Sequence, residues 1–403
     1  MSELHPDPVA GRPVVKLRPG KGRRLAEGAP WAFADEIAMD RRTRAIAPGA
    51  LVRLVEGSRS LGLAAFNLQS TIAARLIDPN PEAAIDAGWF AARLSRAMEL
   101  RQALFAAPYY RLVHAEGDGL PGVIVDRYGD TLVVQPNAAW ADVRLPLLTE
   151  ALQRVTGAGT VVVNAAARAR RLEGLDEHVT VVAGAVSAPV PVPMNGATYL
   201  ADVVGGQKTG LFFDQRPNHA FAARLAKGKR MLDVFAHVGG VALAGLAAGA
   251  ESALAIHSSA PALALAEQGA ALTGVAERLT TRSADAFDAL RNLADEAARF
   301  DLVVFDPPAF APNRGALAKG LAAYQRLARL AAPLAAPGGW LVLCSCSHAA
   351  DPKSFHRANA RGIGQAGRGA VLVRSGRAGP DHPVHIALPE TSYLKALFYR
   401  LDG

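Results

Sequence analysis

The stretch Phe-Asp-Leu-Val-Val-Phe-Asp-Pro-Pro-Ala-Phe, residues 300–310, decides the fold. Its first six residues form a short β-rich run closed by turn residues, which predicts a buried strand of a parallel sheet. Pro307 and Pro308 cannot continue a central hydrogen-bond ladder, so the chain must leave the sheet just after Asp306. We therefore expect Asp306 at the carboxyl end of a strand, where open α/β sheets bind their ligands.

A second apolar run, residues 339–343, predicts another buried strand, and it ends in Cys-Ser-Cys-Ser-His. If the two strands are neighbours, the carboxylate of Asp306 and the thiol of Cys346 lie over one pocket. Free cysteines are usually small core hydrophobes, and we expect this of Cys344. Cys346 lies past the strand end, where a thiolate can act as a nucleophile.

Strands and helices alternate from about residue 208 onward. The sequence predicts strands at 230–235, 252–256, 279–281, 302–305 and 340–343, and helices at 260–272, 286–298 and 317–334. This alternation predicts a doubly wound α/β sheet, a Rossmann-like fold. The last two runs, 370–374 and 393–401, leave no room for a long helix and predict an antiparallel hairpin at the sheet edge.

The first half of the chain has a different pattern. Short strands at 14–17, 50–55, 61–66 and 72–77 predict a small β-barrel, and a helix is expected at 82–105. A strand at 110–114, a hairpin at 123–135, a helix at 140–155 and a strand at 160–164 predict a small α+β domain. With 403 residues, too many for one core, we predict three domains at 14–80, 81–195 and 196–403.

The chain carries 44 Lys and Arg against 36 Asp and Glu, a net charge of +8. A basic balance suits a polyanionic partner through counterion release, although an Arg-rich composition alone could also produce it. The basic residues Lys16, Arg18, Arg23 and Arg24 cluster early, close to Trp31 and Phe33. A β-barrel with a basic rim and an aromatic side chain predicts an RNA-binding module. The alternative is that the aromatics belong to the core and the charges are only solvated.

Two cysteines, one residue apart, give neither a disulfide framework nor a zinc-ligand spacing, which fits a reducing compartment. The N-terminal residues lack the apolar core of a signal peptide, and no long uncharged run predicts a membrane span. We expect a cytoplasmic protein without a metal.

Residues 231–240 predict a strand, a glycine turn and the start of a helix, with Asp233 and Phe235 before Gly239 and Gly240. Glycines here let the backbone approach a ligand closely at a helix N-terminus. The pattern is not the G-x-G-x-x-G of dinucleotide sites, and a tight connection without a ligand explains it equally well.

His257 ends the next predicted strand, where nucleotide-like sites place an acidic residue that holds the ribose hydroxyls. An imidazole accepts a hydrogen bond less strongly than a carboxylate, and a surface histidine capping the turn is the alternative. Ser258 or Ser259 is expected to cap the helix that follows. Asp285 follows the third strand and is either a helix N-cap or a contact to an adenine amino group.

Residues 205–216 gather Gln, Lys, Thr, Asp, Gln and Arg just before the first sheet strand. We expect this segment to cover a cofactor or to contact substrate phosphates. The alternative is a capped helix start with a surface cluster.

Several motifs together resemble one family. They are Asp306-Pro307-Pro308-Ala309-Phe310, Ser345-Cys346-Ser347, and residues 206–210, 214–216, 119–122, 125–129, 381–383, 388–391 and 393–395. The chain from about Val14 onward resembles the class I methyltransferases that modify carbon 5 of cytosine in large-subunit (23S) ribosomal RNA. The resemblance implies a PUA-like RNA-binding domain, a small middle domain and a C-terminal S-adenosylmethionine-binding domain.

The resemblance also implies roles for residues. Cys346 would add to carbon 6 of the cytosine, and Asp306 would hold the ring. S-adenosylmethionine would lie over the turn 235–240, at Gln215, Asp233, Phe235, Gly239, Gly240, His257, Asp285, Asp306 and Pro307. The RNA would contact Lys208, Arg216, Pro308 and Phe310, and the basic residues Lys16, Arg18, Arg23 and Arg24.

One feature departs from this resemblance, and a second is shared with the single-cysteine members of the family. His257 stands where the family usually has an acidic residue. Ala309 and Phe310 occupy the place where some cytosine methyltransferases carry a second cysteine that helps to release product. Two alternatives stay open: a methyltransferase for another base, in which Cys346 is structural, and a non-catalytic RNA-binding assembly factor. The expected partner is ribosomal RNA, with a homodimer plausible and no membrane.

Overall fold

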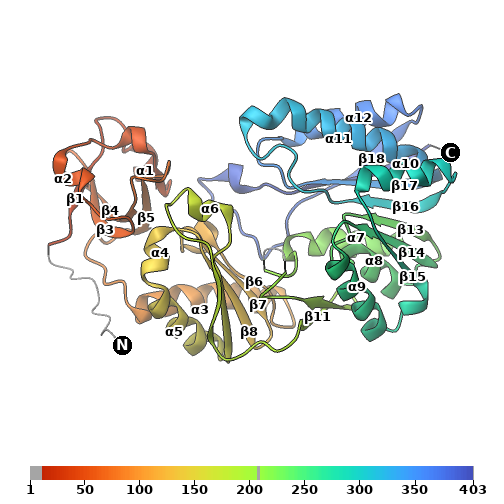
Figure 1. The fold of residues 1–403 in the computed structure, drawn as a ribbon. Coiled ribbons are helices and arrows are strands. Elements are labelled where there is room, and N and C mark those ends of the chain that lie inside the picture. Colours follow the sequence, from red (N-terminus) through yellow and green to blue (C-terminus); the bar gives the residue numbers. More distant parts are fainter. Residues whose placement is uncertain (1–10, 207–208, 403) are drawn as a thin grey trace. The chain divides into compact units, whose positions relative to one another are not determined.

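The computed structural model describes residues 11–206 and 209–402 (Figure 1). The chain divides into two units. The first unit contains Met1–Ala188, Val203–Thr209 and Asp381–Pro389, and the second contains Pro189–Asp202, Gly210–Pro380 and Glu390–Gly403. The domain limits expected from the sequence stay predictions.

The first unit begins with a five-stranded sheet in the order β1-β3-β4-β5-β2. Its strands are β1 (Val14–Lys16), β2 (Trp31–Ala32), β3 (Ala50–Glu56), β4 (Arg59–Phe66) and β5 (Ala74–Asp78), with short helices α1 (Arg23–Ala26) and α2 (Arg41–Arg44). On β1 the buried Val15 lies between two exposed residues, which is the period-two pattern of a half-buried strand, whereas residues 62–66 of β4 are all buried. The four predicted strands are confirmed, whereas β2 is too short to give a pattern.

A second five-stranded sheet completes the first unit, in the order β10-β9-β8-β7-β6. Its strands are β6 (Tyr109–His114), β7 (Val123–Tyr128), β8 (Thr131–Pro136), β9 (Thr160–Asn164) and β10 (Val179–Ala183), and its helices are α3 (Ala87–Leu104), α4 (Ala139–Val143), α5 (Leu145–Thr156) and α6 (Arg168–Arg171). The predicted β7–β8 hairpin is confirmed. The single helix predicted at 140–155 is wrong, because Pro146 lacks an N–H and begins a new helix.

The second unit is built on a seven-stranded sheet in the order β15-β14-β13-β16-β17-β19-β18. The strands are β13 (Arg230–Val234), β14 (Ser252–His257), β15 (Leu279–Ser283), β16 (Phe300–Phe305), β17 (Ala335–Ser345), β18 (Ala370–Gly376) and β19 (Lys395–Leu401). The first five are parallel, as predicted. The predicted antiparallel hairpin is confirmed, but β19 lies between β17 and β18, so only β18 is at the edge.

Helices cover both faces of this sheet (Figure 1). They are α7 (Arg216–Arg224), α8 (Gly240–Ala247), α9 (Ala260–Thr273), α10 (Ala286–Asp295), α11 (Leu317–Ala331) and α12 (Pro352–Gln365). A two-stranded sheet, β11 (Val190–Met194) with β12 (Ala197–Ala201), precedes them. The sequence did not reveal β11 because Pro191 and Pro193 are unfavourable in a strand interior and are tolerated here on an edge.

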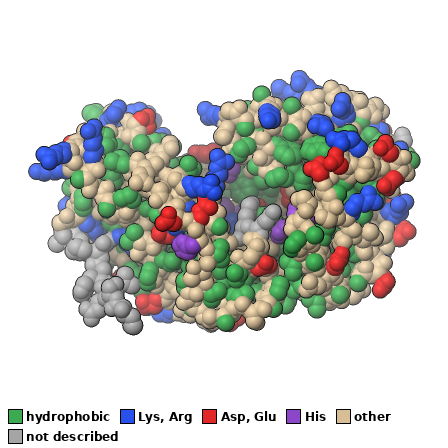
Figure 2. Space-filling view, in the orientation of Figure 1, with side chains coloured by type: hydrophobic (Ala, Val, Ile, Leu, Met, Phe, Trp, Pro, Cys, Tyr) green, Lys and Arg blue, Asp and Glu red, His purple; other side chains and the backbone are tan. Residues whose placement is uncertain are grey.

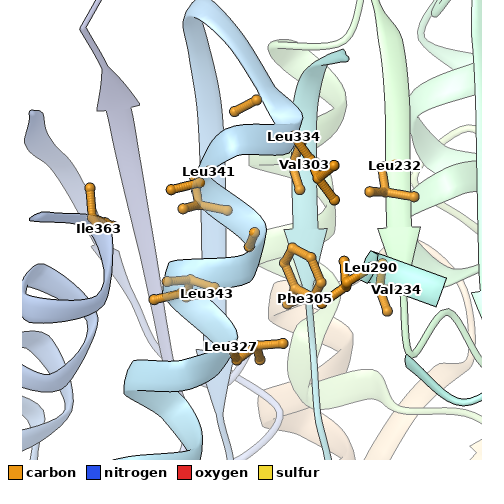
Figure 3. Close-up of a cluster of buried hydrophobic side chains, with 14 of the residues drawn as sticks. Leu232, Val234, Leu290, Val303, Phe305, Leu327, Leu334, Leu341, Leu343 and Ile363 are labelled. Atoms are coloured by element: carbon orange, nitrogen blue, oxygen red, sulfur yellow. The ribbon is translucent and has the colours of Figure 1, made fainter. Parts of the chain in front are cut away.

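Figure 3 shows the core between the sheet and the helices α10, α11 and α12. Side chains of three adjacent strands supply one side: Leu232 and Val234 on β13, Val303 and Phe305 on β16, and Leu341 and Leu343 on β17. Each is at most 2% exposed, and each contributes on the order of 1.5–3 kcal/mol by leaving water. This packing fixes the register of the three strands and brings their carboxyl ends together.

Over residues 11–206 and 209–402, the structure contains no helix with both the length and the apolar character needed to cross a bilayer.

Candidate active site

Asp306 and Cys346 lie at the ends of neighbouring strands. In the β16–β17 ladder Phe305 is paired with Leu343, so Asp306 follows beside Cys344 and Cys346 is two residues further on. The backbone N–H of Asp306 donates to the carbonyl of Val234 at 3.3 Å, which ties the Asp-Pro-Pro turn to β13. Both Asp306 and Cys346 are partly exposed. The structure therefore brings together the carboxylate and the thiol on which the sequence prediction depends.

The two cysteines have different surroundings. Burial raises the pKa of the Cys344 thiol, and the charge of Asp306 acts in the same direction, as do the charges of Asp233 and Cys346. A thiol with a raised pKa is a poor nucleophile at neutral pH. The same interactions show that Asp306 and Cys346 both lie within electrostatic reach of one sulfur atom.

A buried hydroxyl network fixes the turn that carries Cys346. The Tyr324 hydroxyl of α11 bonds Ser345 Oγ at 2.9 Å and Ser347 Oγ at 2.8 Å, one residue on each side of Cys346. Ser347 Oγ also accepts from the N–H of Ala311, just after the Asp-Pro-Pro turn, at 3.0 Å. A side chain held between two such anchors is preorganised. The sequence analysis assigned no role to these serines or to Tyr324.

The turn after β13 has the strained backbone of a binding loop. Phe235 and His237 adopt positive φ angles of 65° and 50°, next to Gly239 at 79°. Such conformations cost on the order of 1–3 kcal/mol in non-glycine residues and cluster at ligand sites. A Cβ atom at Gly240 would lie 2.6 Å from Cε1 of His219, so no larger residue fits there.

Asp233 stabilises this turn through hydrogen bonds to backbone N–H groups. Its Oδ2 accepts from the N–H groups of Ala242 at 2.9 Å and Val241 at 3.3 Å, at the start of α8. Burial raises the pKa of Asp233 to about 7, and the two N–H groups act against this rise. At 2% exposure Asp233 holds the loop through these bonds, and its contact to the cofactor stays a prediction.

His257 ends β14, as predicted, but it is not a surface cap. Both ring nitrogens are buried and have no hydrogen-bond partner among the residues that the structure describes. Burial lowers the pKa of His257, which favours the neutral ring, and the ring packs edge-on against His237 at 5.9 Å. Ser259 is the cap of α9, accepting from the N–H of Ala262. An unsatisfied buried imidazole at a strand end is suited to a ligand that carries hydroxyl groups.

Asp285 is exposed and caps α10, since its Oδ1 accepts from the N–H groups of Phe287 at 2.9 Å and Asp288 at 3.2 Å. The structure thus supports the N-cap interpretation. A contact to an adenine amino group stays a prediction.

Gln215 lies in the turn η3 (Phe213–Gln215), which leads into α7. Its Oε1 accepts from Asn218 at 2.7 Å, and its buried Nε2 lies beside the Cys344 thiol without a hydrogen bond of normal geometry to any described residue. Arg216 places its guanidinium 5.3 Å from the ring of Phe213. Lys208, the other basic residue expected here, lies outside the described residues.

The Asp-Pro-Pro turn divides into a buried and an open part. Pro307 is buried and Pro308 is exposed. Phe310 packs its ring 4.9 Å from that of Tyr324 and 6.5 Å from that of Phe287. These contacts pack the Phe310 ring against the protein next to the site.

The basic residues expected on the first sheet are exposed, and Figure 2 shows Lys and Arg side chains on this part of the surface. Arg23 and Arg24 form ion pairs with Glu27 at 2.8 Å and Glu36 at 3.1 Å, whereas Lys16 and Arg18 lie on and just after β1. Trp31 donates its indole N–H to Glu116 at 2.8 Å. Trp31 is partly exposed and so is not a core residue, but its polar edge is engaged within the protein. A contact between Trp31 and RNA stays a prediction.

The residues around the turn fit S-adenosylmethionine. The positive-φ turn gives the chain the tight conformation of a binding loop, Gly240 has no room for a side chain, and His257 offers unsatisfied nitrogens to hydroxyl groups. Among the described residues there is no cluster of His, Cys, Asp or Glu that could hold a metal ion.

Comparisons with known proteins agree with this site. A family model described as S-adenosylmethionine-dependent methyltransferase matches residues 151–399, and a PUA-like domain model matches residues 15–79. The fold and the site thus define an S-adenosylmethionine-dependent methyltransferase with an N-terminal PUA-like domain.

Relatives over the whole length narrow this class. The chain is 35% identical over 392 residues to Ribosomal RNA large subunit methyltransferase I of Shewanella denitrificans, covering 96% of this chain and 99% of the relative. It is 34% identical over 390 residues to the protein of the same name from Vibrio cholerae, covering 95% and 98%. The chain belongs to the Ribosomal RNA large subunit methyltransferase I family.

Solved structures support the fold alone. A protein designated a methyltransferase and crystallised with SAH aligns with a TM-score of 0.81 at 18% identity, covering 96% of this chain and 99% of that chain. A protein from Streptococcus mutans designated a SAM-dependent methyltransferase gives 0.81 at 17% identity, covering 96% and 100%.

Proposed function

We propose that this protein methylates carbon 5 of a cytosine in 23S ribosomal RNA through a covalent adduct between Cys346 and the base. The observation that carries the proposal is the pairing of Asp306 with Cys346 at adjacent strand ends, with Cys346 held in a fixed turn. The ribosomal RNA substrate is taken from the names of the full-length relatives.

The chemistry requires a nucleophile because carbon 5 of cytosine is too weak to attack a methyl sulfonium by itself. In the proposed step the Cys346 thiolate forms a bond to carbon 6, and the ring electrons shift so that carbon 5 becomes enamine-like. Asp306 holds the nitrogen edge of the ring and stabilises the adduct. S-adenosylmethionine supplies the methyl group that carbon 5 then takes up. The base must leave its stack to reach such a pocket.

Release needs a proton acceptor. The proton on carbon 5 leaves, its electron pair forms the 5,6 double bond, and the carbon 6–sulfur bond breaks to return the thiolate. Ala309 and Phe310 stand where a second cysteine would assist this step, and Phe310 is turned into the packing against Tyr324. We therefore assign the proton to water or to another base.

Cofactor and RNA contacts follow the same reasoning. We propose that His257 accepts a hydrogen bond from a ribose hydroxyl, that Gln215 and Pro307 line the cofactor pocket and that Asp285 contacts the adenine. The exposed side chains of Lys16 and Arg18 suit contacts to RNA phosphates. Pro308 is also exposed and suits a contact to the target base. Arg23 and Arg24 must share their charge with Glu27 and Glu36. The homodimer stays a prediction.

The test is methyl transfer to ribosomal RNA from a strain that lacks this gene, with the product digested and 5-methylcytidine identified by mass. Cys346→Ala should abolish transfer, and Cys344→Ala should retain it because Cys344 is 4% exposed and packs in the core. Transfer that survives in Cys346→Ala would refute the adduct. Methylation of a different base would favour the alternative in which Cys346 is structural, and a failure to bind cofactor would favour the assembly factor.

A further inference from the structure

Lys395 is a buried lysine at the foot of the Cys346 turn. It begins β19, directly opposite Ser345 in the last pair of the β17–β19 ladder, and it is only 6% exposed. Lysine side chains are almost never this buried unless their charge is compensated. The residue therefore requires an explanation.

The ammonium group holds the turn by binding two of its backbone carbonyls, both after Cys346 in the chain. Nζ donates to the carbonyl of Ser347 at 2.6 Å and to that of Ala350 at 2.9 Å. Ser347 follows Cys346 directly, and Ala350 ends the turn before Asp351, the N-cap of α12. Together with the Tyr324 hydroxyl, this clamp leaves the turn little freedom.

Hydrogen bonds alone would hold the turn without a charge on the lysine. The charges near Lys395 indicate that its own positive charge also has a role. Burial lowers the pKa of Lys395 to about 8, while the negative charges of Cys346 and Asp351 act to raise it. Coulomb interaction is mutual, so an ammonium group stabilised by the Cys346 thiolate stabilises that thiolate in return.

Other groups face the same turn. The carboxylates of Asp306, at the end of β16, and Asp351, on α12, oppose a thiolate because they carry the same charge. The negative charge of Cys346 acts to raise the pKa of Tyr324 on α11 and of Cys344 on β17. The ring of His348 packs beside that of Tyr393, with 5.3 Å between the ring centroids. Asp306 acts on the Cys344 thiol and Asp351 acts on Lys395, whereas Lys395 is a cation on which the charge of Cys346 acts directly.

We propose that Lys395 is a positioning residue that holds the Cys346 turn and supplies the positive charge that keeps Cys346 in its thiolate form. The inference deepens the proposed function, since it explains how Cys346 would be ready for attack.

The test is the pH profile of Cys346 alkylation by iodoacetamide, measured on the full chain in a Cys344→Ala background, where Cys346 is the sole cysteine. Only the thiolate reacts, so the pH at which the alkylation rate is half-maximal gives the pKa of the Cys346 thiol. We expect the parent midpoint below about 8.5, the value of a free cysteine. Lys395→Met should raise the midpoint by about one pH unit, equivalent to roughly tenfold less thiolate at pH 7, and Lys395→Arg should stay near the parent.

Lys353→Met is the matched control, because Lys353 is an exposed lysine on α12 and its loss changes the net charge equally. Its midpoint should not move. An unchanged midpoint in Lys395→Met, or an equal shift in Lys353→Met, would overturn the proposal. If the melting curve shows that Lys395→Met does not fold, the midpoint of the parent is the test. A parent midpoint at or above about 8.5 would contradict the proposal.

This assay needs neither RNA nor cofactor, so it is independent of the proposed methylation. If Cys346→Ala still methylates RNA, the proposed function fails whatever the alkylation shows. If the midpoint does not depend on Lys395 but Cys346→Ala is inactive, only the role of Lys395 fails.

Discussion

The two units differ in how the charges of their buried side chains are compensated. In the first unit Arg101 is fully buried and its guanidinium binds Asp118 at 2.5 and 2.7 Å, and Arg75 pairs with Glu173 at 2.9 Å. In the second unit the ion pairs described are on the surface, such as Lys229 with Asp301 at 3.9 Å. Several of its buried polar atoms lie instead at the strand ends, where the nitrogens of His257 have no described partner, although the first unit also contains such atoms, for example Nδ1 of His114.

The difference separates structural polarity from functional polarity. A buried charge that is paired and hydrogen-bonded holds elements together, and its removal leaves the partner uncompensated. A buried polar atom without a partner costs free energy in the protein alone and is retained where a ligand completes it. The following predictions test this distinction, from the largest expected effect to the smallest.

Asp306→Asn should lower the rate of methyl transfer by on the order of 10²–10⁴-fold, because the carboxylate that stabilises the adduct is lost. The melting temperature should change little, since Asp306 is partly exposed and its backbone bond to Val234 remains. Single-turnover kinetics and a melting curve measure both. A fall in stability with unchanged rate would place Asp306 among the structural carboxylates.

Arg101→Met should have the opposite profile. The substitution leaves Asp118 buried without its cation, and it also removes bonds to the carbonyls of Arg111 and Asp381, both at 2.9 Å. The free energy of unfolding should fall by about 3–5 kcal/mol. Lys229→Met, which breaks an exposed pair, should cost at most about 1 kcal/mol.

Urea unfolding measures the effect of Arg101→Met, and the affinity for S-adenosylmethionine should stay unchanged under native conditions. A loss as small as that of Lys229→Met would show that the buried pair is not structural.

Two buried histidines give the units a shared acid sensitivity. Burial lowers the pKa of His114, in the first unit, to about 2, with His382 and Arg111 adding to the effect, and burial lowers the pKa of His219, in the second unit, to about 4. The unfolded chain binds these protons more readily, so the stabilisation is complete above about pH 6.5 and falls as the pH decreases. Each histidine should cost about 1.4 kcal/mol per pH unit below that value.

The contribution of each histidine is measured as the difference in unfolding free energy between the parent and His114→Gln or His219→Gln, at pH 7.5 and pH 5.5. Both differences should shrink by about 1.4 kcal/mol at the lower pH. Differences that are equal at the two pH values would mean that folding does not change the pKa of these rings.

His257→Asp should tighten cofactor binding by about tenfold, because a carboxylate accepts a stronger hydrogen bond from a ribose hydroxyl than a neutral imidazole does. His257→Ala should weaken it. Calorimetric titration with S-adenosylmethionine measures the three affinities. Identical affinities would remove His257 from the cofactor site, and no binding at millimolar cofactor by the parent would leave either a non-catalytic RNA-binding protein or a site that assembles only on RNA.

Much of this site could be predicted from the sequence because its signals are local. The Asp-Pro-Pro turn must end a strand, and the order of apolar runs gives parallel strands, so Asp306 and Cys346 were expected together. The roles of Tyr324 and Lys395 could not be predicted, since they come from α11 and β19 and reach the Cys346 turn only through tertiary packing. The hydrogen bond of Trp31 could not be predicted either, because its partner, Glu116, is distant in the sequence.

The most direct test of the central claim is covalent trapping on ribosomal RNA that contains 5-fluorocytidine. Once carbon 5 bears both fluorine and a methyl group it has no proton to lose, so the carbon 6–sulfur bond of the adduct cannot break by elimination. We predict a protein–RNA complex that survives denaturing electrophoresis in the parent and in Cys344→Ala, and none in Cys346→Ala. A complex that persists in Cys346→Ala, or no complex in a parent that methylates unmodified RNA, would contradict the account.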